Sequence, residues 1–130
     1  MNIRNTKPHC ILVVDDEEAI CVLLKMHLEG IGFRVELAQN GESALEVLQE
    51  FNIDAVITDQ DMPGMKGTDL CKRACLAQPH LQERFLFISG NLAYAQAGFP
   101  GRMIQKPFSL DAIGTAVCEL FAGRTLPANV

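Results

Sequence analysis

The chain has 130 residues, of which 48% are hydrophobic and 21% are charged, and its formal net charge is −5 at pH 7. This length and balance predict one globular domain with a single core, and they exclude a disordered chain or a coiled coil. The negative charge, with no run of Lys or Arg to offset it, predicts no binding to nucleic acid, and the apolar runs are far shorter than the roughly 20 residues of a membrane span.

Five short runs have the composition of β-strands. Three of them contain nearly continuous apolar stretches, ILVV, AVIT and FLFI. Such stretches are typical of strands that are buried on both faces of a sheet, and they indicate a parallel sheet covered by helices. The predicted strands are Cys10–Val14, Phe33–Ala38, Ile53–Thr58, Phe85–Ser89 and Arg102–Gln105.

The interval after the first strand has helical periodicity. Within Glu18–Glu29, four apolar side chains share one helical face, and Gly30 is the residue expected to end the helix. The four are Ile20, Leu23, Leu24 and Leu28.

The later helices are predicted largely from their first turns. Asn40, Thr68 and Ser109 each have a side-chain oxygen that can accept a hydrogen bond from a backbone N–H there. The helix that Thr68 opens should end before Pro79. The predicted helices are Gly41–Phe51, Thr68–Ala77, Leu92–Ala97 and Leu110–Phe121, of which Leu92–Ala97 is short.

Strand and helix therefore alternate five times along the chain. Right-handed crossovers between parallel strands then predict a doubly wound α/β sandwich, with ligands bound at the carboxyl ends of the strands. We expect one domain over residues 1–130, with a core from about 10 to 122 and short tails.

Polar side chains stand at four of these five strand ends. Asp15 and Asp16 follow the first strand, Asp59 follows the third, Ser89 ends the fourth and Lys106 follows the fifth. Carboxylates gathered at one sheet edge repel one another, and a hard divalent cation relieves that repulsion. Because Mg²⁺ is held by one or two carboxylates together with phosphate oxygens, phosphate chemistry is the natural use of the site.

A phosphoryl-transfer reaction can be assembled from these groups. The carboxylate of Asp59 can attack a phosphoryl group if the charge on that group is neutralised. A metal held by Asp16 and Asp59, with Asp15 acting through water, supplies part of that charge. Lys106 supplies a fixed positive charge, and the Ser89 hydroxyl can donate a hydrogen bond to a phosphoryl oxygen.

Four motifs, each at its predicted strand end, resemble those of response-regulator receiver domains, including the single-domain chemotaxis type. They are Asp15-Asp16, the D-x-x-M-P-G run at Asp59–Gly64, the serine of ISG, and K-P-F at Lys106–Phe108. The resemblance runs from about Ile11 to Phe121. It implies a flavodoxin-like fold with a five-stranded parallel sheet in the order 2-1-3-4-5.

The resemblance also implies roles for individual residues. Asp59 matches the phosphoacceptor, Asp15 and Asp16 match the acidic pair that binds Mg²⁺, and the backbone carbonyl of Asp61 completes the metal shell. Ser89 matches the switch hydroxyl and Lys106 the lysine that contacts the phosphoryl group. The Lys106–Pro107 bond is expected to be cis.

The same resemblance implies partners and a location. The phosphoryl group is expected to come from a sensor histidine kinase or a histidine phosphotransfer protein, and the output is expected to be a contact with another protein. The protein is expected to be cytoplasmic and not an enzyme, beyond self-catalysed phosphorylation and dephosphorylation.

Of the departures from the commonest family pattern, two concern the switch. Met103 stands where an aromatic switch residue is usual, and Ser89 and Lys106 are only 17 residues apart. The fourth helix is therefore expected to be shortened. We expect phosphorylation to move residues 89–97 more than Met103, because a methionine cannot make the hydroxyl-coupled rotation of a tyrosine.

Other interpretations of the chain remain open at this point. The AVITDQD run is also similar to the first motif of haloacid-dehalogenase-type phosphatases, but that assignment leaves Asp15 and Asp16 without a role. A phosphorelay intermediate, or a receiver that is part of a hybrid kinase, is a second alternative. Because the chain begins with Met and its tail is short, a free-standing protein is the default expectation.

The five cysteines form no C-x-x-C pair, and their number is odd. This pattern predicts reduced thiols in a cytosolic protein. Cys71 and Cys75 lie one helical turn apart, so a metal site with His80 is conceivable, but two thiols on one face of a helix are the favoured interpretation.

Overall fold

The computed structural model describes residues 8–91 and 101–122 of the chain. Five parallel strands form one sheet in the order β2-β1-β3-β4-β5, as predicted. The strands are β1 (Cys10–Val14), β2 (Arg34–Ala38), β3 (Ala55–Asp59), β4 (Phe85–Ser89) and β5 (Arg102–Gln105). The predicted bounds of β1, β4 and β5 are confirmed, whereas β2 begins one residue later and β3 is shifted so that it includes Asp59.

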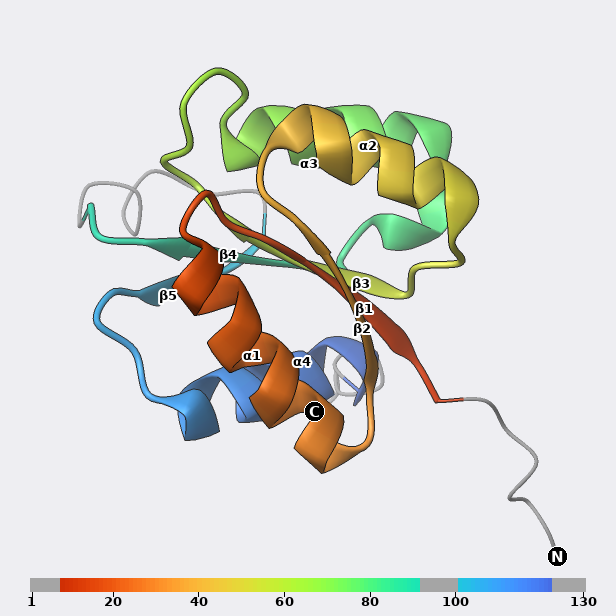
Figure 1. Cartoon of the computed structure of the whole chain (residues 1–130). Coiled ribbons are helices and arrows are strands. Elements are labelled where there is room, and N and C mark those ends of the chain that lie inside the picture. Colours follow the sequence, from red (N-terminus) through yellow and green to blue (C-terminus); the bar gives the residue numbers. More distant parts are fainter. Residues whose placement is uncertain (1–7, 92–100, 123–130) are drawn as a thin grey trace, which may run out of the picture.

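Helices cover both faces of the sheet (Figure 1). One face carries α1 (Glu18–Ile31) and α4 (Leu110–Ala122), and the other carries α2 (Gly41–Glu50) and α3 (Gly67–Ala77). A short 3-10 helix, η2 (Pro79–Leu81), which was not predicted, follows α3. The helix expected at Leu92–Ala97, and with it the shortened fourth helix, lies outside the described residues.

The core is divided by the sheet into two layers. Alternate residues of β1 show the division, since Leu12 and Val14 pack with α2 and α3 while Ile11 and Val13 pack with α1 and α4. All five residues of β1, β3 and β4 are buried, so each of these strands contributes apolar side chains to both layers. This explains why they are continuous apolar runs.

Helix α1 differs from its prediction in its end and in its buried face. It runs to Ile31, and the residue that ends it is Gly32, whose φ of 122° lies in the region that favours glycine. The N–H of Gly32 donates to the carbonyls of Leu28 and Glu29. The prediction that Leu23 faces the core is also wrong, because it is 44% exposed while Cys21 is buried.

The predicted helix caps are confirmed at two positions and wrong at one. Asn40 accepts from the N–H of Ser43, and Ser109 accepts from the N–H of Ala112. Helix α3 begins at Gly67, so Thr68 lies inside it instead of capping it. The predicted end of α3 at Ala77 is confirmed, whereas α2 ends at Glu50 and α4 at Ala122, each one residue from its predicted end.

Candidate functional site

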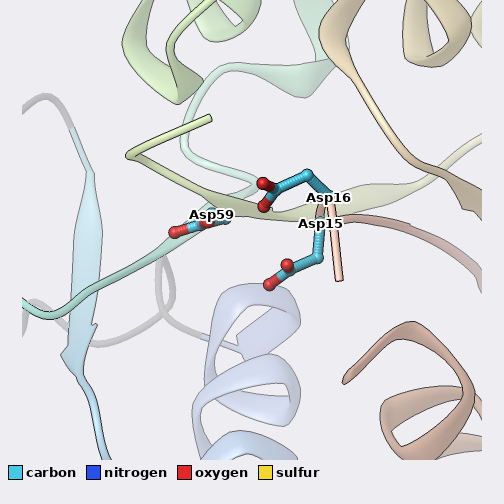
Figure 2. A group of neighbouring side chains, drawn as sticks. All are labelled: Asp15, Asp16 and Asp59. Carbon is cyan, nitrogen blue, oxygen red and sulfur yellow. The ribbon is translucent and has the colours of Figure 1, made fainter. Parts of the chain in front are cut away.

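Three aspartate side chains meet where β1 and β3 end (Figure 2). Asp15 and Asp16 directly follow β1, and Asp59 is the last residue of β3. One carboxylate oxygen of each lies within 4.8 Å of the other two. Asp15 and Asp59 are buried, whereas Asp16 is exposed. The adjacent parallel strands, paired from Ile11 with Ala55 to Val14 with Thr58, bring these three residues together as the sequence predicts.

Burial makes this cluster electrostatically unfavourable. It raises the pKa of Asp15 to about 6, and the neighbouring Asp59 carboxylate contributes to the rise. Burial also raises the pKa of Asp59, although the ammonium group of Lys106 opposes the rise. Within the described residues, Oδ2 of Asp15 is a buried polar atom with no hydrogen-bond partner. A positive charge placed here would lower both pKa values and give that oxygen a partner.

The donor atoms of the cluster fit a hard divalent cation. All three are carboxylate oxygens, which Mg²⁺ prefers over nitrogen or sulfur ligands. Asp15 Oδ1 already accepts from the N–H of Glu17 at 2.9 Å, which orients the carboxyl group and leaves Oδ2 available to a metal. The acidic pocket can therefore hold a metal ion.

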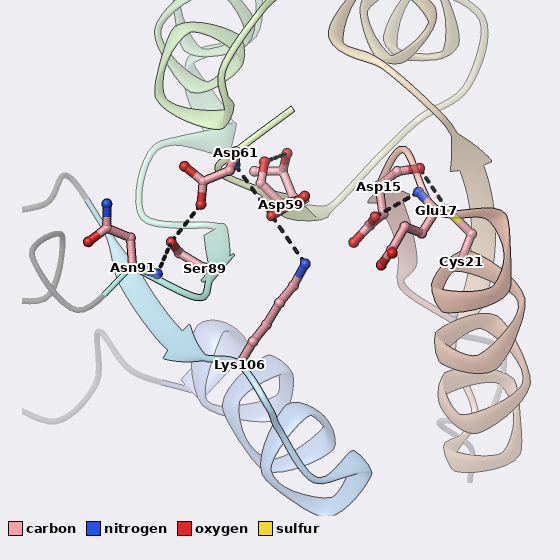
Figure 3. Close-up of polar contacts among 9 residues, drawn as sticks. Asp15, Glu17, Cys21, Asp59, Asp61, Ser89, Asn91 and Lys106 are labelled. Atoms are coloured by element: carbon pink, nitrogen blue, oxygen red, sulfur yellow. Dashed lines mark hydrogen bonds and ion pairs between the residues drawn. The ribbon is translucent and has the colours of Figure 1, made fainter. Parts of the chain in front are cut away.

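Lys106 supplies a positive charge beside Asp59. It follows β5, and its Nζ lies 3.5 Å from Oδ1 of Asp59 (Figure 3). The backbone of Lys106 is anchored, because its N–H donates to the carbonyl of Ser89 at 2.9 Å. The Lys106–Pro107 peptide bond is cis, as expected.

Ser89 takes part in a contact that the sequence did not predict. Its hydroxyl donates to Oδ2 of Asp61 at 2.8 Å, and its Oγ accepts from the N–H of Asn91 at 3.0 Å. Figure 3 shows these three residues in a row beside Asp59. The side chain of Asp61 thus contacts the Ser89 hydroxyl, while its N–H donates to Oδ1 of Asp59 at 3.3 Å.

Gln60 is a further residue of the site that the sequence did not single out. It is 2% exposed, its Oε1 accepts from the N–H of Thr68, and its Nε2 donates to the Thr68 hydroxyl. Gly67 lies so close that a Cβ there would be 2.8 Å from the carbonyl oxygen of Asp59. Gln60 therefore joins the first turn of α3 to the end of β3, and no motif in the sequence signals this role.

The alternative metal site on α3 does not form. Cys71 and Cys75 do lie together, with their Sγ atoms 3.9 Å apart, but Nε2 of His80 lies 2.9 Å from the carbonyl oxygen of Ile53. Burial raises the pKa of the Cys71 thiol to about 12 and also raises that of Cys75. Both thiols remain protonated at neutral pH.

The fold and the site together define a class of protein. Residues 11–117 match the response regulator receiver domain family. The chain belongs to this family, whose members serve in two-component signal transduction and are signalling modules rather than classical enzymes. This family membership replaces the haloacid-dehalogenase-type phosphatase as the interpretation of the chain.

Among individual proteins, the chain is similar both to sensor kinases and to response regulators. It is 35% identical over 127 residues to the virulence sensor protein BvgS of Bordetella pertussis, covering 90% of this chain and 10% of BvgS. It is 32% identical over 123 residues to the response regulator MprA of Mycolicibacterium vanbaalenii, covering 92% of this chain and 53% of MprA. The chain thus spans about a tenth to a half of the length of these two relatives.

Solved structures confirm the fold. A response regulator receiver protein from Sinorhizobium medicae has a TM-score of 0.79 at 29% identity, covering 91% of this chain and 98% of that one. The response regulator protein TrrA from Thermotoga maritima, solved in complex with Mg(2+)-BeF, has a TM-score of 0.76 at 29% identity, covering 86% and 98%.

None of the helices in the described part of the chain combines the length and the apolar character that crossing a bilayer requires.

Proposed function

We propose that Asp59 accepts one phosphoryl group from a phosphohistidine, carried by a sensor kinase or a histidine phosphotransfer protein, and that the phosphorylated domain signals by contact with another protein. The observation that carries this proposal is the position of Asp59 close both to a lysine and to two further carboxylates. Lys106 Nζ lies 3.5 Å from Oδ1 of Asp59, and a carboxylate oxygen of Asp59 lies within 4.8 Å of carboxylate oxygens of Asp15 and Asp16. We infer that the reaction takes place in the cytoplasm, within a single domain whose core spans about 10–122.

In the proposed reaction, a carboxylate oxygen of Asp59 attacks the phosphorus atom. The new P–O bond forms as the P–N bond to the donor imidazole breaks, and the imidazole leaves with the electron pair. Lys106 stabilises the negative charge on one phosphoryl oxygen, because its ammonium group is already held beside Oδ1 of Asp59. The product is an acyl phosphate.

Mg²⁺ is the proposed cofactor, held by the side chains of Asp15, Asp16 and Asp59 and by the backbone carbonyl of Asp61. When bound, it neutralises charge on the carboxylates and on the phosphoryl oxygens. The unpartnered Oδ2 of Asp15 supports this assignment, as does the Mg(2+)-BeF complex of TrrA. Asp15 and Asp59 orient the site through their hydrogen bonds with the N–H groups of Glu17 and Asp61.

The test is incubation with a small phosphodonor and Mg²⁺, followed by intact-mass measurement. We expect one phosphate to appear, to require the metal and to be removed by hydroxylamine, which cleaves acyl phosphates. In Asp59→Asn the modification should be absent. In Lys106→Ala the fold should persist while the initial rate falls by about a hundredfold, since a preorganised charge contributes on the order of 10² to 10³ in rate.

Asp54→Asn is the matched control, because it makes the same change at the opposite end of β3. It should be phosphorylated at the wild-type rate. Labelling of Asp59→Asn at the wild-type level, or continuous turnover of the donor without a stable acyl phosphate, would contradict the proposal.

A phosphorelay step is a second candidate, favoured by one observation. BvgS, the sensor kinase CckA of Brucella abortus and the sensor kinase/phosphatase LuxN of Vibrio harveyi match this chain over only 10–13% of their own length. A domain of such a kinase would return the phosphoryl group to a histidine. Transfer from phosphorylated Asp59 to a histidine phosphotransfer protein, followed by gel autoradiography, distinguishes the two roles.

A further inference from the structure

The Ser89 hydroxyl has a single proton, and in this structure the hydroxyl uses it to donate a hydrogen bond to Asp61. The bond from Oγ to Oδ2 is 2.8 Å long, and its acceptor is a carboxylate. Hydrogen bonds to a charged acceptor are stronger than those between neutral groups. In the proposed function, the same proton is needed by a phosphoryl oxygen on Asp59, so two anionic acceptors compete for one donor.

The backbone of Ser89 is held in place during this competition. Its carbonyl accepts from the N–H of Lys106, and the preceding carbonyl of Ile88 accepts from the N–H of Gln60. Ser89 is completely buried at the end of β4. The hydroxyl can therefore change its acceptor mainly by rotation of the side chain, without movement of the strand.

We propose that the Asp61–Ser89 contact is a latch that holds the switch hydroxyl in its unphosphorylated position and so opposes the response to phosphorylation. This proposal rests on the proposed function, since it assumes a phosphoryl group on Asp59. Asp61 acts through Ser89 and is a positioning residue. The Ser89 hydroxyl must leave Asp61 before it can donate to the phosphoryl group. The energy of its hydrogen bond to the phosphoryl group is therefore partly offset by the loss of its bond to Asp61.

The latch also connects the site to the chain that follows β4. The N–H of Asn91 donates to the same Oγ at 3.0 Å, so rotation of the hydroxyl changes that bond as well. A change at Asp59 that rotates the Ser89 hydroxyl therefore also alters the hydrogen bond between Ser89 Oγ and the N–H of Asn91 (Figure 3).

A double-mutant cycle on the full chain separates the latch from simple charge repulsion. The four proteins are wild type, Asp61→Ala, Ser89→Ala and the double variant. The measurement is the Kd of beryllofluoride at saturating Mg²⁺, by calorimetry. Beryllofluoride is used because it binds to the Asp59 carboxylate in the place of a phosphoryl group. Asp61 is exposed, and alanine keeps the backbone carbonyl, so the substitution preserves the fold and the proposed metal ligand.

We expect Asp61→Ala to tighten beryllofluoride binding, by about fivefold to tenfold more in the wild-type background than in the Ser89→Ala background. Glu46→Ala is the charge-matched control, since Glu46 is exposed on α2, and it should change the Kd less than twofold. If Ser89→Ala does not fold, Ser89→Cys replaces it, because a thiol is a weak donor of similar size.

Equal tightening in both backgrounds would overturn the latch, because Asp61 would then act by its charge alone. Weaker binding in Asp61→Ala would also overturn it. A wild-type chain that binds no beryllofluoride and accepts no phosphate would instead overturn the proposed function itself, and these outcomes are distinguishable.

Discussion

Strand β3 has one aspartate just before its first residue and another as its last, and the two carboxylates are in opposite circumstances. Oδ2 of Asp54 accepts from the N–H of Cys10 at 2.8 Å and lies 3.6 Å from Nδ1 of His9, and the side chain is 38% exposed. The Asp59 side chain is 5% exposed, and it lies close to the Lys106 ammonium group and to two further carboxylates.

The difference indicates that carboxylates stabilise the fold at one edge of the sheet and destabilise it at the edge that carries the site. At the amino edge of the sheet, Asp54 stabilises the fold by pairing with β1. At the carboxyl edge, burial and like charge act against the ionised forms of Asp15 and Asp59, and Oδ2 of Asp15 has no hydrogen-bond partner among the described residues. Such unsatisfied buried groups are uncommon in folded proteins and concentrate where a ligand will complete them.

The largest expected effect is an opposite change in stability at the two edges. Asp15→Asn should raise the free energy of unfolding at pH 7.5 by about 2 to 3 kcal/mol. The reason is that the folded state raises the pKa of Asp15 from 3.8 to about 6, so ionising this carboxyl group has a cost in free energy that asparagine does not have. Asp54→Ala should lower it by about 1 to 2 kcal/mol, because the Cys10 N–H loses its acceptor. Urea unfolding measures both values.

The stabilisation by Asp15→Asn also depends on pH. Since the pKa of Asp15 is raised in the folded state, the folded chain binds more protons than the unfolded chain between about pH 4 and pH 6, and its stability falls as pH rises through that window. Above pH 6 the full cost is present. The stabilisation by Asp15→Asn should therefore disappear at pH 4, and a gain that persists there would break the comparison.

A smaller effect is expected from Mg²⁺. At a concentration tenfold above its Kd, a ligand of the folded state stabilises by about 1.4 kcal/mol, which raises the Tm by roughly 5 °C for a domain of this size. At pH 5, protonation of Asp15 reduces the apparent affinity about tenfold, and the stabilisation falls to about 0.4 kcal/mol.

Thermal unfolding with and without Mg²⁺ at both pH values checks this expectation. Asp15→Asn removes one of the proposed ligands and should lose most of the Mg²⁺ effect, whereas Asp54→Ala should keep it. A Tm increase that is the same at pH 5 and pH 7.5 would place the metal elsewhere on the chain.

The residues alone were sufficient to predict a parallel sheet and the meeting of Asp15, Asp16 and Asp59, whereas the strand order followed from the resemblance to receiver domains. Continuous apolar runs identified the buried strands, and parallel strands bring their carboxyl ends to one edge. What it could not predict depends on contacts between distant residues. Leu23 fits the helical stripe but faces solvent, and Thr68 resembles a cap although its N–H and hydroxyl are bound by Gln60.

The Asp61–Ser89 contact escaped prediction for the same reason. Both residues were recognised as part of the site, but Asp61 for its backbone carbonyl and Ser89 as a donor to phosphate. The bond between their side chains depends on how the chain turns after Asp59, where the N–H of Asp61 returns to Oδ1 of Asp59. Such a turn brings together side chains that are 28 residues apart in the sequence.

The smallest expected effect is a local change in the backbone when beryllofluoride and Mg²⁺ bind. The amide of Asn91 should shift strongly in ¹H–¹⁵N spectra, because its hydrogen bond to Ser89 Oγ is rearranged, and the amide of Asp54 at the opposite edge should not shift. Met103 on β5, which lies in register with Phe87 of β4, should shift less than residues 89–97, since its side chain has no hydroxyl to follow that of Ser89. A Met103 shift larger than that of Asn91 would mean that β5 carries the signal and that the methionine replaces the usual aromatic switch.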